Sequence, residues 1–131
     1  MKDQLRFTTD VENRSALKAP RPIDIVQLQT TVSTVATART DADFQIESLV
    51  ANNTSGTADY VTVHLVPSGG SASTANTIAY QVVVAGNGMT VIFDREKQGL
   101  LQPGATVQAL CGVNDRVNIW GYGFDYQGVY S

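Results

Sequence analysis

The amino-acid sequence predicts an all-β protein, a single antiparallel β-sandwich of the jelly-roll type with about eight strands and an extended N-terminal arm. Short runs rich in β-branched and aromatic residues recur along most of the chain. Clusters of Gly, Asn, Ser and Pro separate these runs, as expected for turns between strands. No segment has a convincing helical pattern, and 131 residues suit one domain with one core.

Eight runs are assigned as strands. In chain order they are residues 23–29, 31–38, 43–51, 59–66, 77–85, 89–93, 106–112 and 116–126. The first three consist largely of β-branched and other apolar residues, and the turn cluster NNTSG closes the third. The GNG triplet before Met89 indicates a tight hairpin, because Asn and Gly accept positive φ angles. The segment 94–101, DREKQGLL, is expected to form one helical turn at most.

The alternation of residue types predicts which side chains two of these strands bury. In DYVTVHLV, Val61, Val63 and Leu65 lie on one face of the strand and the more polar residues lie on the other. In TVQALCG, the same alternation places Val107 and Ala109 on one face. We therefore expect these five side chains to point into the core.

Residues 1–22 differ in character from the rest and are interpreted as an extended arm, followed by the β-sandwich domain at 23–131. The segment holds most of the Lys and Arg residues of an acidic protein and ends in APRP, whose prolines favour extended backbone. We expect the arm to become ordered against a partner, with Leu5 and Phe7 as apolar anchors. The candidates for reading an acidic neighbouring surface are Arg6, Arg14 and Arg21. A frayed terminus is the alternative interpretation.

Composition and charge argue against several classes of protein. The net charge of −3 and the pI of about 4.9 argue against a nucleic-acid-binding surface. No apolar run approaches the roughly 20 residues that span a bilayer, so no membrane partner is expected. The N-terminus lacks the apolar stretch of a signal peptide, and the single cysteine, Cys111, permits no internal disulfide. These features predict synthesis in a cytoplasm.

The sequence contains no recognisable catalytic, cofactor-binding or metal-binding pattern. His64 is the only histidine, and its place in the alternation predicts that it faces solvent or a partner. Cys111 alternates with the inward residues of its strand, which indicates a small buried hydrophobic residue rather than a catalytic thiolate. The nearby carboxylates Asp41 and Asp43 match no calcium-binding loop and are typical of a solvated surface. We therefore expect a protein that is not an enzyme.

The segment VNIWGYGFDYQGVY, residues 117–130, combines many aromatic residues with glycines. If it forms one regular strand, aromatic side chains line one face and two glycines on the other face let a neighbouring backbone or ring approach closely. The aromatic side chains on that face are Trp120, Tyr122, Phe124 and Tyr126. Three interpretations remain open. A bulge turns the aromatic residues into the core, they form a protein interface, or they stack on sugars.

Two stretches resemble small virion proteins of tailed bacteriophages. The first runs from VANNTSG to GMTVIF and the second from GLLQPGATVQALCG to VNIWGYGFDY, so the resemblance covers residues 45–126 and not the arm. Such proteins often pair a strand ending near VPSGGSA and ANTI with a later L-x-x-G-x-x-V-x-A strand and a last strand of the VNI-x-G type. The ending WGYGFDYQGVY holds more aromatic residues than that pattern. The resemblance implies a non-enzymatic structural part of the particle, without a cofactor, on the head, the neck or the tail.

The leading hypothesis is a decoration or accessory protein of a tailed-phage virion, made in the host cytoplasm, that binds the capsid or neck and stabilises subunit contacts. Its expected partners are other virion proteins and further copies of itself, and a trimer would suit a site between capsomers. The alternative is a tail- or fibre-associated module that binds host glycan through Trp120, Tyr122 and Tyr126. An enzyme on a jelly roll is the third hypothesis, disfavoured by the lack of a His cluster.

Overall fold

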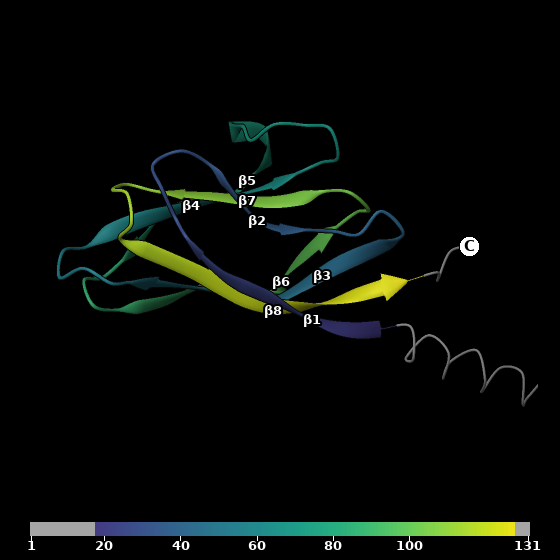
Figure 1. Cartoon of the computed structure of the whole chain (residues 1–131), viewed down its shortest axis with the longest axis horizontal. Coiled ribbons are helices and arrows are strands. Elements are labelled where there is room, and N and C mark those ends of the chain that lie inside the picture. Colours follow the sequence, from purple (N-terminus) through teal and green to yellow (C-terminus); the bar gives the residue numbers. More distant parts are fainter. Residues whose placement is uncertain (1–17, 128–131) are drawn as a thin grey trace, which may run out of the picture.

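Two four-stranded antiparallel sheets pack face to face in the structure, which is a computed structural model (Figure 1). It describes residues 18–127, apart from the side chains of residues 95–98 and 127. The strands are β1 (Lys18–Gln27), β2 (Ser33–Thr37), β3 (Ala42–Asn53), β4 (Asp59–Val66), β5 (Thr77–Val84), β6 (Met89–Leu101), β7 (Thr106–Cys111) and β8 (Val117–Gln127). A short 3₁₀ turn, η1 (Thr74–Asn76), precedes β5. The predicted all-β sandwich is confirmed.

The strand order identifies the sandwich as a jelly roll. Sheet A has the order β1-β8-β3-β6, and sheet B has the order β2-β7-β4-β5. The chain crosses between the sheets at nearly every connection, and its first and last described strands pair side by side in sheet A. In Figure 1, sheet A forms the lower layer and sheet B the upper layer.

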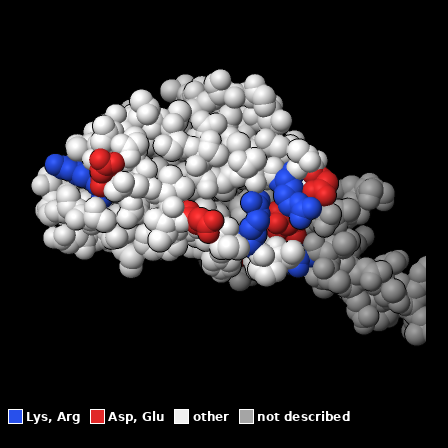
Figure 2. Space-filling model, in the orientation of Figure 1, with Lys and Arg blue, Asp and Glu red and all other residues white. Residues whose placement is uncertain are grey.

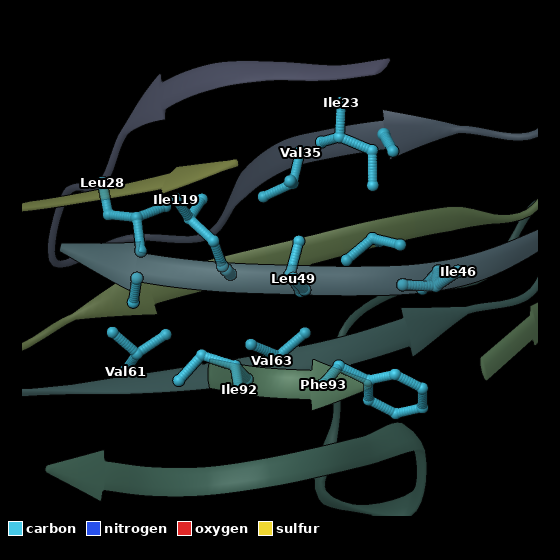
Figure 3. Close-up of a cluster of buried hydrophobic side chains, with 14 of the residues drawn as sticks. Ile23, Leu28, Val35, Ile46, Leu49, Val61, Val63, Ile92, Phe93 and Ile119 are labelled. Carbon is cyan, nitrogen blue, oxygen red and sulfur yellow. The ribbon is translucent and has the colours of Figure 1, made fainter. Parts of the chain in front are cut away.

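The core between the sheets consists of side chains from alternate strand positions (Figure 3). Val61, Val63, Val107 and Ala109 have no exposed surface, which confirms the inward faces predicted for β4 and β7. Leu65 is partly buried and packs at the margin of the core. Large side chains from sheet A complete the cluster, among them Phe44, Ile46, Leu49, Leu101 and Ile119.

A close approach between β3 and β8 explains the glycines on the inward face of β8. The register of β3 against β8 shifts between Ile46 and Ser48, which marks a bulge in β3. A Cβ atom at Gly121 would collide with the carbonyl oxygen of Ser48, and a Cβ atom at Gly123 would collide with that of Gln45. Because β8 itself stays regular, its aromatic residues remain on the outer face. The interpretation that turns them into the core is therefore wrong.

Strand β6 is longer than the predicted run 89–93. It continues to Leu101 because its second half pairs with the first half of β3. The segment 94–101, expected to form at most one helical turn, is therefore a strand. Its register passes from Gly99 opposite Ile46 to Asp94 opposite Ser48, so residues 95–98 form an irregular stretch in this edge strand. Long-range pairing thus overrides the local preference of a polar segment.

Strand β1 begins earlier than predicted, at Lys18. Residues 18–22, assigned above to the arm, therefore belong to the sandwich, and residues 1–17 lie outside the described part. Pro20 lies opposite Phe124 and Pro22 lies opposite Tyr122. Since β1 is an edge strand of sheet A, it tolerates prolines, which have no backbone N–H group to donate. The prolines were correctly interpreted as favouring extended backbone, but that backbone is paired.

Candidate interface on the outer face of sheet A

The aromatic side chains of β8 lie in a row on the outer face of sheet A. Val117 and Ile119 point into the core with no exposed surface, so the even-numbered residues from Asn118 to Tyr126 point outward. Tyr122 is 49% exposed, and Trp120 is half-buried like the other two aromatic residues of the row. The structure thus brings together four of the predicted interface residues, Trp120, Tyr122, Phe124 and Tyr126.

Exposed aliphatic side chains of β6 extend this row across the sheet. Val91, 58% exposed, lies opposite Val50 of β3, which in turn lies opposite Trp120. Leu100, 49% exposed, reaches the same face two strands away from Phe124. We call the combined surface the sheet A face. It consists of Val50, Met89, Val91, Leu100, Trp120, Tyr122, Phe124 and Tyr126.

The aromatic rings differ in how much of their surface they offer. Tyr122 and Phe124 meet edge to face, with ring centroids 6.2 Å apart and planes at 79°. The ammonium group of Lys18, on β1, lies 4.2 Å from the centroid of Phe124 and 5.8 Å from that of Tyr126. A cation therefore covers one end of the row, while Tyr122 remains its most exposed ring.

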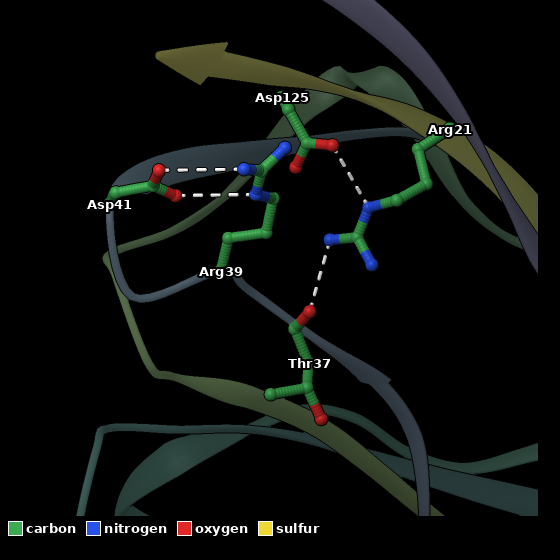
Figure 4. Close-up of polar contacts among 5 residues, drawn as sticks. All are labelled: Arg21, Thr37, Arg39, Asp41 and Asp125. Atoms are coloured by element: carbon green, nitrogen blue, oxygen red, sulfur yellow. Dashed lines mark hydrogen bonds and ion pairs between the residues drawn. The ribbon is translucent and has the colours of Figure 1, made fainter. Parts of the chain in front are cut away.

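Arg21 is engaged inside the chain rather than displayed to a partner (Figure 4). Its Nε atom lies 3.1 Å from Asp125 Oδ2, and one of its terminal N–H groups donates to the carbonyl oxygen of Thr37, at 3.0 Å. The guanidinium also lies 4.3 Å from the centroid of the Phe44 ring. Arg21 therefore ties β1 and β8 of sheet A to β2 of sheet B. The expectation that it reads an acidic neighbour does not match this position.

Arg39 and Asp41 form a second ion pair beside this contact, also drawn in Figure 4. Arg39 Nε lies 3.2 Å from Asp41 Oδ1, and about half of each side chain is exposed. Solvent screens such a pair strongly, so it adds little to stability. The assignment of Asp41 to a solvated surface agrees with this exposure.

His64 does not face solvent, contrary to the sequence-based expectation. It is only 7% exposed, because the loop between β4 and β5 folds back over the outer face of sheet B. Its Nδ1 atom lies 3.0 Å from the carbonyl oxygen of Ser73 and 3.0 Å from Thr77 Oγ1. The alternation in β4 correctly separated His64 from the core residues. It could not reveal the path of the loop that covers the ring.

Cys111 is buried, as predicted, with 1% of its surface exposed. Burial raises the pKa of the Cys111 thiol above its ordinary value of 9.0, and the nearby Asp59 carboxylate raises it further. Asp59 itself is held by the backbone N–H groups of Gly112 and Val113, at 3.0 and 3.1 Å. Among the side chains that the structure describes, no three of His, Cys, Asp or Glu gather in a way that could hold a metal ion.

We expect the Cys111 thiol to react at least about tenfold more slowly with an aromatic disulfide reagent in the native protein than in denaturant, at about pH 8. The thiolate is the reacting species. The raised pKa lowers the fraction of thiolate, and burial limits the access of the reagent to the sulfur atom. Because the folded pKa is raised, the thiol's contribution to stability is complete below pH 9.0 and is lost as the pH rises further. Equal labelling rates in both states would contradict this environment.

Part of the interface was not predictable from the sequence. The cross-strand register alone places four further residues beside the aromatic row, and no local sequence pattern reveals that register. These residues are Lys18, Met89, Val91 and Leu100. The remaining predicted anchors, Leu5, Phe7, Arg6 and Arg14, lie outside the described residues.

No helix in the described part is long and apolar enough to cross a membrane.

Comparison with known proteins gives distant structural similarity only. No family model matches the sequence, and no curated protein matches it. A chain from the disulfide-linked pili of Bacillus endospore appendages superposes with a TM-score of 0.47 at 17% identity, over 84% of this chain and 89% of the other. A chain of infectious bursal disease virus, Gt strain, gives 0.30 at 12% identity, over 85% of this chain and 32% of the other. The corresponding Gx-strain chain gives 0.31 at 10% identity, over 85% and 37%.

Proposed function

We propose that this chain is a non-enzymatic structural subunit of a virion and that it docks on neighbouring virion proteins through the sheet A face. One observation carries the proposal: a regular, uninterrupted strand places four aromatic side chains in a row outside the core, beside three exposed aliphatic ones. Tyr122, Met89, Val91 and Leu100 are each between 49% and 67% exposed. Large apolar side chains gathered on one face are typical of a surface that a partner covers.

The chemistry of the sheet A face supports a protein partner. Tyr and Trp are enriched at protein interfaces because they bury a large area and keep a polar tip. One part of the face, around Trp120, Val50 and Val91, is apolar. Charged residues border this part: Asp94 lies across Ser48 from Tyr122, and Lys18 and Asp43 flank Tyr126. Apolar and aromatic residues bordered by charged groups are common in protein interfaces.

The finer assignment, to a decoration or accessory protein on the head or neck of a tailed phage, rests on the resemblance of residues 45–126 to small virion proteins. The arm formed by residues 1–17 remains part of the proposal, as a second contact with the particle. The glycan-binding alternative, through Trp120, Tyr122 and Tyr126, is less well supported. Trp120 and Tyr126 are half-buried, and the Lys18 ammonium group lies 5.8 Å from the Tyr126 centroid, which leaves Tyr122 as the most exposed ring for stacking.

Replacing Tyr122 by aspartate is expected to reduce binding of the full chain to particles that lack it by about tenfold or more, as for a residue at the centre of an interface. The substitution places a charge in the middle of the aromatic row, while the exposure of Tyr122 leaves the core intact. Co-sedimentation with particles measures the affinity, and electron microscopy locates the added density of 14.0 kDa per copy.

Thr31→Asp supplies the matched control, because it adds the same charge in the exposed loop between β1 and β2. Equal binding by the wild type and the Tyr122 variant would contradict docking through this face. Quenching of Trp120 fluorescence by oligosaccharides, with no quenching by particles, would favour the glycan alternative instead.

A further inference from the structure

The outer surface of sheet B carries almost no charge. From Tyr60 to Phe93, and again from Gly99 to Asn114, the sequence contains no Lys, Arg, Asp or Glu. These two segments supply β5 and β7, nearly all of β4, and the loop with η1. The remaining acid of the sheet, Asp59, is 7% exposed and bound by backbone N–H groups. In Figure 2, the upper part of the molecule over sheet B is white, and coloured atoms gather below it and towards the ends.

This uncharged surface also exposes large apolar side chains along β5. Tyr80 is 70% exposed, Val83 is 67% exposed and Ile78 is 36% exposed. Val83 and Tyr60 line a shallow depression of about 340 Å³, together with Val113 in the turn after β7. We call this surface the sheet B face. Its outward residues include Tyr60, Ile78, Tyr80, Val83, Gln108 and Leu110.

A soluble protein usually keeps charges on its surface, and roughly a quarter of all residues in an average protein are charged. Their absence over a whole sheet face is therefore informative, because the centre of a protein interface is depleted in charge and enriched in aromatic residues. The sheet B face has both properties. It differs in this respect from the sheet A face, where Lys18 and Asp43 lie beside the aromatic row.

We infer that the sheet B face binds the same face of a second copy of this chain, related by a two-fold axis. An uncharged surface cannot compensate the charges of a partner that it desolvates, so the covering surface must also lack charge. The same face of another copy meets this condition, because a two-fold axis brings the same surface patch of both copies together. The sheet A face does not meet this condition, because it carries the charged residues Lys18 and Asp43. The arrangement is thus a dimer, unlike the trimer that the sequence analysis allowed.

The area of the sheet B face determines the dissociation constant that we expect for the dimer. Four strands of this length cover roughly 20 Å by 20 Å, or about 400 Å², and the loop over His64 covers part of that area. This is about half of the roughly 800 Å² that each partner buries in a standard-size interface. We therefore expect a weak, transient dimer with a dissociation constant of about 100 µM. Because no charged pairs contribute, the constant should change by less than about twofold between about 50 and about 500 mM NaCl.

Sedimentation velocity of the full chain tests the inference. From about 1 to about 300 µM, the weight-average mass should rise from 14.0 kDa towards that of two copies. Val83→Asp should remain a monomer over the whole range. Met89→Asp is the matched control, because Met89 is equally exposed, at 67%, but lies on the sheet A face. It should dimerise like the wild type.

Four outcomes would overturn the inference. They are a wild type that stays monomeric throughout, a plateau above two copies, association that weakens strongly with salt, and a dimer that survives Val83→Asp. If Val83→Asp lowers the melting temperature, Tyr80→Asp provides the same test at a position that is 70% exposed. The measurement needs no particles, so its failure is distinguishable from failure of the docking function proposed for the sheet A face.

Discussion

Val63→Asp is expected to lower the free energy of unfolding by roughly 3–5 kcal/mol. Val63 has no exposed surface and lies near the middle of β4, between Ala79 of β5 and Ala109 of β7. The variant either buries a charge that no group in the core compensates or protonates the carboxyl at a similar free-energy cost. Urea denaturation monitored by circular dichroism measures the change in midpoint and slope.

Val91→Asp is the matched control for this variant. It makes the same chemical change on a strand of the sandwich, but Val91 is 58% exposed on the sheet A face. Its effect should stay within about 0.5 kcal/mol of zero. Equal urea midpoints for the two variants would mean that the inward face of β4 is wrongly assigned.

Gly123→Ala is expected to destabilise the protein by about 2–3 kcal/mol, through overpacking rather than through loss of a contact. The added methyl group would collide with the carbonyl oxygen of Gln45 and lie 2.5 Å from the Phe44 ring. The Phe44 ring also packs against Arg21, so its displacement disturbs the contact that ties β1 to the rest of the sandwich. Thermal and urea unfolding measure the loss.

Gly56→Ala is the control for this substitution. The nearest atom to a Cβ at Gly56 is Asn87 Nδ2, at an ordinary contact distance of 3.8 Å. The change should therefore be neutral or slightly stabilising, since alanine reduces the conformational entropy of the unfolded chain. A Gly123 variant as stable as the Gly56 variant would show that β3 and β8 do not approach as closely as described.

The sequence predicted the strands best where both ends carried local signals. Strand β4 matches the predicted run 59–66, because turn residues bound it and its apolar residues alternate with a period of two. The run 89–93 was too short, because nothing local shows that the polar residues after Phe93 pair with β3. Residues 18–22 were assigned to the arm for the same reason, since their pairing partner lies about a hundred residues later in the chain.

The candidate interface was predictable in part. Alternation in the last strand showed that the aromatic residues share a face, but it could not show whether that face is inside or outside. The answer depends on β3, whose bulged backbone occupies the space beside Gly121 and Gly123. The exposed residues of β6 and the cover over His64 likewise depend on register and on loop path. Each of these is set by contacts between residues far apart in the sequence.

The two flanks of sheet A have a consequence for behaviour at high concentration. The β1 flank carries Pro20 and Pro22, and the β6 flank loses its regular register at residues 95–98. Neither flank offers a long, even row of free backbone donors and acceptors, which is what one chain needs in order to template amyloid-like growth of another. At high concentration, the two flanks of sheet A therefore disfavour edge-to-edge pairing of this sheet between copies.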